Sequence, residues 1–190
     1  MTSRSTLTAE DWIKAAFRAL SAGGPAAVKA EAIARDLDVS KGSFYWHFKD
    51  VAALKSEMLH HWIQRGTSEI IDAVEATGAS PAERLRSLVR EATGGRGSDY
   101  GGEAVEAAIR EWARYDAAAA AALRSVDERR LAYVAELFAA HGVPVNRAGR
   151  DARLLYAALV GLGSLAGEGA VDPRGDMLDL LGRLLGDGKP

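Results

Sequence analysis

The sequence predicts an all-α protein of about nine helices, and three observations support this fold class. Apolar residues recur at spacings of three and four, which is the period of a helix. No stretch shows the alternation of β-branched residues that is typical of strands. Gly and Pro residues divide the chain into segments rich in strong helix formers, including the alanine run 117–122.

Helix start and stop signals order the elements along the chain. Thr8 can cap a first helix with Asp11 as its partner, and Gly23 and Gly24 can end it. A short second helix follows, then the aromatic segment 39–50, and then a long helix from about Asp50. The later helices are expected at 80–93, 103–116, 117–142, 146–169 and 174–186, and the Gly-rich segment 94–102 interrupts them as an inter-helix loop.

Composition sets limits on function. The 190 residues are 48% apolar and 26% charged, which is enough for a sizeable core and a polar surface. The sequence has no run of 18 apolar residues, no signal-peptide pattern and no cysteine, so we expect a cytoplasmic protein without membrane segments or disulfides. The net charge of −2 gives no support for nucleic-acid binding, which must rest on a local patch.

The segment VSKGSFYWHFKD, residues 39–50, concentrates aromatic residues in a short stretch. The short helix before it ends near Leu37, a tight turn is expected at residues 38–39, and Ser40 can cap a second short helix. Two short helices joined by such a turn, after a longer helix, have the layout of a helix-turn-helix. We therefore expect a three-helix domain at residues 1–49 and a second helical domain at residues 50–190.

The second helix of this motif has two chemically different faces. Phe44 and Phe48 are four residues apart and can point into the core. The remaining side chains are then left exposed or partly exposed, where they can meet phosphates and base edges: Lys41, Ser43, Tyr45, Trp46 and His47. Gly42 would allow close approach to a duplex. The same spacing also fits an aromatic plug in the core of an ordinary helical bundle.

These residues resemble the DNA-binding region of the TetR family of transcriptional regulators, which carries a pattern S-x-G-x-x-Y-x-H-F followed by lysine. Here the pattern stands at Ser40, Gly42, Tyr45, His47, Phe48 and Lys49. The resemblance covers residues 8–60, and it implies binding to a palindromic DNA operator. It implies that Lys41 and Ser43 approach bases, that Tyr45 and His47 hold phosphates, and that Lys29 and Lys49 contact the DNA backbone.

Three positions depart from the family pattern. Asp38 stands in the turn where glycine is frequent, although Asp tolerates a left-handed backbone better than most residues. Val51 replaces a polar or basic residue, and Glu31 adds a negative charge near the DNA-facing side. The last two departures predict modest affinity for non-specific DNA.

No other motif in the chain carries chemistry. His60 and His61 are adjacent and point about 100° apart on a helix, so they cannot chelate one ion together. No metalloprotease, P-loop or nucleophile motif is present. We therefore expect no metal, no cofactor and no catalytic residue.

The second domain holds two further candidate features. A set of aromatic residues can line a pocket for a small apolar or aromatic effector, although ordinary core packing would also explain them: Trp62, Trp112, Tyr115, Tyr133 and Tyr156. The last two helices are strongly apolar, which predicts a four-helix homodimer interface built from Leu155, Leu159, Leu162, Ala166, Leu178, Leu181 and Leu185.

The sequence thus predicts a homodimeric, effector-responsive transcriptional regulator, most simply a repressor. The main alternative is a helical small-molecule-binding protein or enzyme in which the helix-turn-helix is only structural. A helical interaction module is a third possibility.

Overall fold

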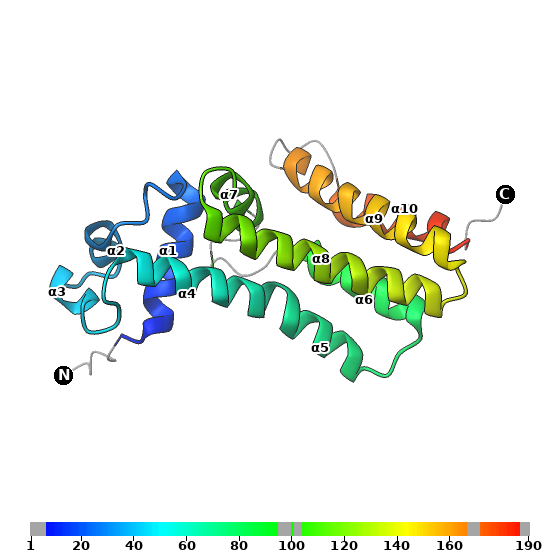
Figure 1. Cartoon of the computed structure of the whole chain (residues 1–190), viewed down its shortest axis with the longest axis horizontal. Coiled ribbons are helices and arrows are strands. Elements are labelled where there is room, and N and C mark those ends of the chain that lie inside the picture. Colours follow the sequence, from blue (N-terminus) through cyan, green and yellow to red (C-terminus); the bar gives the residue numbers. More distant parts are fainter. Residues whose placement is uncertain (1–6, 95–99, 101–103, 167–171, 187–190) are drawn as a thin grey trace. The chain divides into compact units, whose positions relative to one another are not determined.

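The computed structural model describes residues 7–94, 100, 104–166 and 172–186 (Figure 1). All regular elements in this part of the chain are helices, which confirms the predicted all-α class. If α4, η1 and α5 are counted as one continuous helix, the described residues form nine helices, as predicted. No described helix is long and apolar enough to cross a membrane.

The helices divide between two compact units. The first unit contains α1 (Ala9–Gly23), α2 (Ala30–Asp36), α3 (Lys41–Phe44), α4 (Val51–Ile63), α7 (Ala104–Trp112) and the first residues of α8 (Ala117–Ala140). The second contains η1 (Gln64–Ser68), α5 (Glu69–Ala76), α6 (Pro81–Ala92), the rest of α8, α9 (Val145–Ala166) and α10 (Pro173–Leu185). The chain therefore passes from one unit to the other three times, after Trp62, between α6 and α7, and after Leu123. The domain boundary expected at residue 49 stays a prediction.

The first unit is built around the apolar stripe of α1. This helix begins at the predicted capping box, in which Thr8 and Asp11 bond each other's backbone N–H groups, and it ends at Gly24, whose φ is 67°. Its buried side chains meet apolar residues of α2, α3, α4 and α7 in a core that contains Trp12, Phe17, Leu20, Ile33, Phe44, Leu54, Met58 and Ile109. The aromatic segment 39–50 is thus anchored on a packed base.

The predicted long helix extends from Val51 to Ala76, but it is not α-helical throughout. Residues Gln64–Ser68 form a π-helical segment, in which the N–H of Glu69 donates to the carbonyl of Gln64 five residues earlier. A π-segment places an extra residue in one turn and shifts the face that follows it. Thr67 and Ser68, which the sequence pattern did not single out, are buried as a result.

The second unit has a core formed by α6, α8, α9 and α10, and α10 packs along both α9 and α6. The α6 helix begins at the predicted Ser80–Glu83 capping box with Pro81 in its first turn. The fully buried core residues are mainly leucine and other aliphatic side chains: Leu85, Val89, Leu137, Phe138, Ala148, Ala152, Leu155, Met177 and Leu181.

Candidate functional site

The turn between α2 and α3 has the geometry that the sequence predicted. Asp38 adopts a φ of 53°, so the aspartate does occupy a left-handed position that usually favours glycine. The N–H of Val39 donates to the carbonyl of Ala34 at 2.9 Å, which closes the turn. Ala34 is buried between the two helices, where a larger side chain would separate them.

The aromatic segment continues beyond α3 as a series of hydrogen-bonded turns. The N–H groups of Tyr45, Trp46, His47 and Phe48 donate to carbonyls three or four residues earlier. Phe44 is fully buried and Phe48 is 6% exposed, as predicted for the inward face. The Phe44 ring lies edge-on to the Trp12 ring of α1 at 5.5 Å. Two of the segment's four aromatic side chains therefore hold it on the core.

The other two aromatic side chains face outward. Tyr45 is 57% exposed and Trp46 is 88% exposed, which is unusual for such large rings. The remaining candidate DNA-binding residues line the same segment in exposed or half-buried positions: Lys29, Ser40, Lys41, Gly42, Ser43, His47 and Lys49. A Cβ at Gly42 would meet only the Ser40 hydroxyl at 3.6 Å, so the fold itself does not require glycine there.

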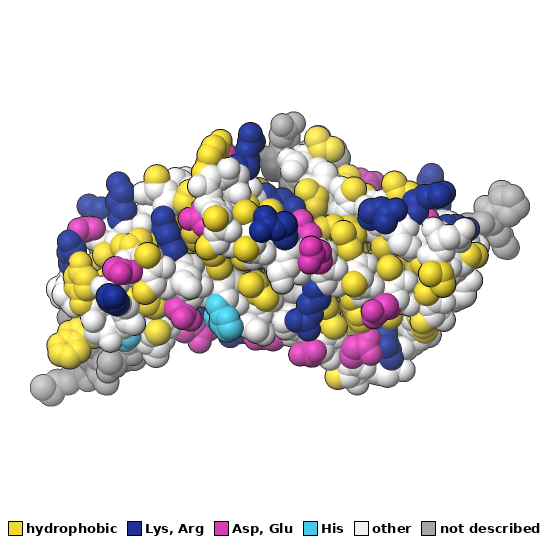
Figure 2. Space-filling view, in the orientation of Figure 1, with side chains coloured by type: hydrophobic (Ala, Val, Ile, Leu, Met, Phe, Trp, Pro, Cys, Tyr) yellow, Lys and Arg dark blue, Asp and Glu magenta, His cyan; other side chains and the backbone are white. Residues whose placement is uncertain are grey.

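Charges in this unit are mixed rather than uniformly basic. Figure 2 shows Lys and Arg interspersed with Asp and Glu over the end of the first unit that carries α1–α3. Lys41 forms an ion pair with Glu31 across the α2–α3 groove. The Lys41 hydrogen bond lowers the pKa of the Glu31 carboxyl, and Glu31 in turn raises the pKa of the Lys41 ammonium. The sequence placed Glu31 near the DNA-facing side but gave no sign of this pairing.

The aromatic residues proposed for an effector pocket do not lie in one unit. Trp62, Trp112 and Tyr115 belong to the first, and Tyr133 and Tyr156 belong to the second. The two tryptophans are buried, whereas Tyr115 is 78% exposed. Two open grooves of the described residues, one beside α2 and α3 and one lined by α1, α4 and residues 47–49, include none of these five side chains.

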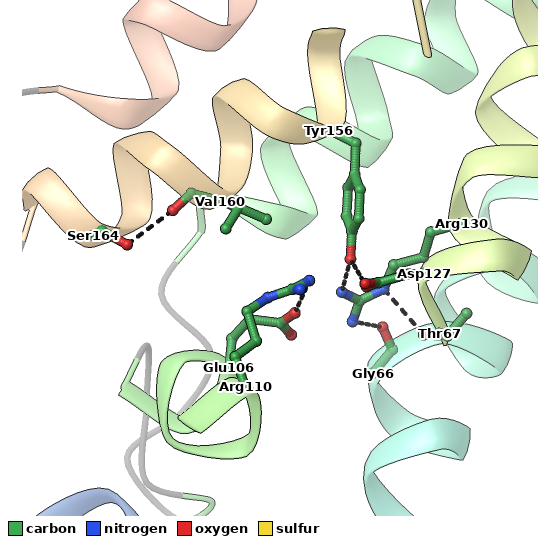
Figure 3. Close-up of polar contacts among 9 residues, drawn as sticks. All are labelled: Gly66, Thr67, Glu106, Arg110, Asp127, Arg130, Tyr156, Val160 and Ser164. Carbon is green, nitrogen blue, oxygen red and sulfur yellow. Dashed lines mark hydrogen bonds and ion pairs between the residues drawn. The ribbon is translucent and has the colours of Figure 1, made fainter. Parts of the chain in front are cut away.

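A partly buried polar cluster in the second unit contacts the π-segment (Figure 3). The Arg130 guanidinium of α8 donates to the Thr67 hydroxyl at 3.1 Å, to the Gly66 carbonyl at 3.0 Å and to the Tyr156 hydroxyl at 3.0 Å. Tyr156 donates in turn to Asp127 at 2.7 Å. The π-segment, α8 and α9 are therefore joined through one guanidinium.

Two other contacts tie the same elements together. Arg129 donates to the Ser68 hydroxyl at 2.8 Å, and Tyr133 donates to Glu75 of α5 at 2.5 Å. Partial burial and the Glu75 hydrogen bond raise the pKa of Tyr133, so this phenol stays protonated. Tyr133 and Tyr156, which the sequence suggests for a pocket, both form side-chain hydrogen bonds.

The leucines proposed for a dimer interface fall into two groups, one buried and one half-buried. Leu155 and Leu181 are 5% and 1% exposed and fill the second unit's own core. The other leucines, Leu159, Leu162, Leu178 and Leu185, are half-buried against that core, and the side chain of Ala166 lies outside the described residues, as does most of the predicted loop 94–102.

A different apolar stripe of α9 faces outward. Leu154 is 51% exposed and Leu165 is 49% exposed, and their separation of eleven residues places them on nearly the same face. Gly161 lies between them, and a Cβ there would meet nothing within 4 Å. The sequence pattern did not separate this stripe from the core-facing stripe, because both contain leucine at helical spacing.

The other groups considered from the sequence show no assembled site. Within the described residues, no three His, Asp or Glu side chains are grouped as metal ligands. His60 is exposed, and His61 stacks on the Tyr100 ring at 5.1 Å, which fits the expectation that the two histidines face different surroundings.

Comparisons with known proteins agree with this geometry. The family model for bacterial regulatory proteins of the tetR family matches residues 13–58, which span α1 to α4. No protein of curated function matches the sequence.

Solved structures extend the likeness to the whole chain. A TetR-family transcriptional regulator from Streptomyces coelicolor is 22% identical, with a TM-score of 0.74 over 95% of this chain and 90% of that one. A putative transcriptional regulator from Saccharomonospora viridis in complex with choline is 20% identical, with a TM-score of 0.76 over 91% and 94%. The transcriptional regulator FadR from Bacillus subtilis in complex with stearoyl-CoA is 11% identical, with a TM-score of 0.68 over 96% and 100%.

At these identities the solved structures establish the shared fold, and the matched domain establishes what the first four helices are. Together they confirm the resemblance seen in the aromatic segment: residues 13–58 match the model of the bacterial regulatory proteins of the tetR family, and the chain shares the fold of solved TetR-family regulators.

Proposed function

We propose that the chain is a cytoplasmic, homodimeric repressor that binds a palindromic operator and is released by a small-molecule effector. The observation that carries the DNA-binding part is the division of the aromatic segment. Phe44 and Phe48 are buried while Tyr45 and Trp46 are exposed beside basic residues. Large exposed rings are unfavourable in water unless they meet a partner, and sugar, phosphate and thymine methyl groups suit them.

The proposed roles follow from exposure and chemistry. Lys41 and Ser43 approach base edges, and Tyr45, His47, Lys29 and Lys49 contact phosphates and the DNA backbone. Trp46 packs on sugars or thymine methyl groups. Gly42 and Ser40 let the start of the helix come close to the duplex, because neither carries a bulky side chain.

Dimerisation is proposed through α9 and α10. The exposed stripe of Leu154, Gly161 and Leu165 supports it, because apolar residues aligned on one helix face commonly mark an interface. Two recognition segments related by a two-fold axis would need a separation of about 34–36 Å to enter successive major grooves on one side of the duplex. The operator would then be a palindrome.

The effector is proposed to be apolar, aromatic or lipid-like, with polar groups recognised by tyrosine hydroxyls or Arg130. Two proteins of the same fold are described in complex with choline and with stearoyl-CoA, which supports a ligand-binding role for this architecture. An effector shifts the protein between two states only by its difference in affinity for them. The proposed path of the signal is the continuous helix formed by α4, η1 and α5.

A direct test uses tryptophan fluorescence. Trp46 is 88% exposed, whereas Trp12, Trp62 and Trp112 are 0%, 6% and 4% exposed, so acrylamide should quench mainly Trp46. Adding a duplex from the region upstream of the chain's own gene should protect Trp46 from acrylamide and retard the protein in a gel. If neither this duplex nor DNA selected from a random library binds, a structural helix-turn-helix in a small-molecule-binding protein becomes the better explanation.

A further inference from the structure

The ion pair between Glu31 and Lys41 lies at the groove between α2 and α3. This open groove has a volume of about 620 Å³ and is lined by both helices and by the turn that joins them, with Arg35, Ser43 and Asp38 among its residues. Lys41 is the first residue of α3, and Glu31 is the second residue of α2. The carboxylate therefore reaches from the supporting helix to the head of the recognition segment.

Both side chains are accessible to a ligand. The Lys41 side chain is 49% exposed and the Glu31 side chain is 59% exposed. An ammonium has three N–H donors, so a single carboxylate leaves donors free to reach an acceptor on a base. Both groups are ionised at neutral pH, and each shifts the pKa of the other further toward its charged form through their hydrogen bond.

We propose that Glu31 is a positioning residue that sets DNA sequence specificity by holding the Lys41 ammonium over the α2–α3 groove and away from phosphates. This inference rests on the proposed binding of DNA through α3. With Lys41 held by Glu31, its free donors face the base edges, where lysine pairs with the O6 and N7 acceptors of guanine. Each half-site should therefore contain a guanine that Lys41 reads.

The same pair lowers affinity for the wrong DNA. On non-operator DNA, a Lys41 ammonium that turns toward a phosphate gives up the position in which Glu31 holds it, and the freed carboxylate then repels the phosphate backbone. Non-specific binding depends almost entirely on phosphate contacts, whereas specific binding also depends on contacts to bases. A carboxylate that occupies Lys41 therefore weakens the non-specific complex more than the operator complex.

The test compares Glu31→Gln with the wild-type chain. The probes are an operator selected from a random duplex library by the wild-type protein, and a scrambled duplex of the same composition. We expect Glu31→Gln to bind the scrambled duplex several-fold more tightly. Its plot of log K against log salt should steepen by about 0.9 for each phosphate that Lys41 gains. Selection with the variant should lose the preference at the guanine position.

A matched control removes a different carboxylate from the same helix. Asp36 in α2 pairs with Arg18 of α1 at 2.5 Å, so Asp36→Asn causes the same change in net charge without touching Lys41. We expect the specificity ratio of Asp36→Asn to stay near that of the wild type. If both variants change scrambled-duplex binding equally, the effect is one of overall charge and the proposal is wrong.

A double-mutant cycle tests whether Glu31 acts through Lys41. In a Lys41→Met background, the added Glu31→Gln substitution should change neither the salt slope nor the selected sequence. An effect of the same size in both backgrounds would overturn the proposal. A wild-type chain that selects no sequence would instead contradict the proposed DNA-binding function, so the two failures are distinguishable. Unchanged unfolding midpoints confirm that these exposed substitutions leave the fold intact.

Discussion

The Nη2 atom of Arg130 donates a 3.0 Å hydrogen bond to the carbonyl oxygen of Gly66, inside the π-helical segment. A carbonyl in such a segment has irregular helical hydrogen bonding, and a side-chain donor from α8 satisfies it here. The same guanidinium also bonds Thr67 and Tyr156. We conclude that Arg130 stabilises the π-segment against a regular α-helical register.

Replacing Arg130 with methionine should therefore destabilise the second unit. The variant leaves Gly66, Thr67 and Tyr156 with fewer partners, at a cost of about 1–3 kcal/mol for each buried group left unpaired. Urea unfolding would measure the loss, and hydrogen exchange should speed up at residues 66–69. Arg124→Met, at an exposed position of the same helix, should stay within about 0.5 kcal/mol of wild type. If both variants lost the same free energy of unfolding, the hydrogen bonds of Arg130 would not stabilise the second unit.

Gly42 should be dispensable for folding but needed for DNA binding. A Cβ at this position meets no atom closer than 3.6 Å, and alanine is a better helix former than glycine by about 1 kcal/mol. Gly42→Ala should therefore match or exceed wild type in thermal stability. If the start of α3 approaches the duplex closely, the same methyl group should weaken operator binding in a gel shift. Wild-type affinity in this variant would place the DNA contact elsewhere.

The Tyr45 hydroxyl is expected to hold a phosphate. Tyr45→Phe keeps the ring, which lies edge-on to Phe44 at 5.3 Å, and removes only the hydroxyl. Binding should weaken on operator and scrambled duplexes to a similar degree, because a phosphate contact carries no sequence information. Anisotropy titrations on both duplexes would measure this. A loss confined to the operator would instead indicate that Tyr45 reads a base.

The helix-turn-helix could be predicted from sequence because its requirements are local. A capping box at Thr8, an aspartate able to take a positive φ at residue 38 and phenylalanines four residues apart each determine the structure within a few residues. The exposed and buried faces of the aromatic segment followed directly from that spacing.

Other features depend on residues far apart in the sequence, and periodicity could not reveal them. The π-segment is bonded by Arg130, more than sixty residues later, so its own sequence looks like ordinary helix. The pairing of Glu31 with Lys41 depends on how closely two helices approach. On α9, leucines that face the core and leucines that face outward have similar spacing, so only the packed structure tells Leu155 from Leu154.

This distinction decides how the dimer should be tested. Leu159→Arg, at a leucine of the interface that the sequence predicts, would place a charge against the unit's own core and destabilise it. Leu154→Arg avoids this problem because Leu154 is 51% exposed. Sedimentation should show a monomer, and urea unfolding should give a near-normal midpoint. Operator affinity should fall strongly because one monomer spans only one half-site. A Leu154→Arg protein that stays dimeric would point to another interface.

The effector response should depend on Tyr156, which links Arg130 to Asp127 through its hydroxyl. Tyr156→Phe keeps the ring and removes this link. The effector's polar group is proposed to be recognised by tyrosine hydroxyls or Arg130. Because a hydrogen bond to a charged group contributes about 1.5–3 kcal/mol, losing the hydroxyl should shift the concentration of effector needed for release about 10-fold or more. Operator binding without effector should stay near normal, because no DNA contact is altered.

Release of a fluorescent operator duplex would be the readout for candidate effectors. Tyr115→Phe is the informative comparison, because the Tyr115 ring is 78% exposed and should contribute less to an enclosed site than Tyr156 does. If Tyr115→Phe shifts the release and Tyr156→Phe does not, the effector binds at the first unit's surface. The polar cluster around the π-segment would then serve only to hold the fold.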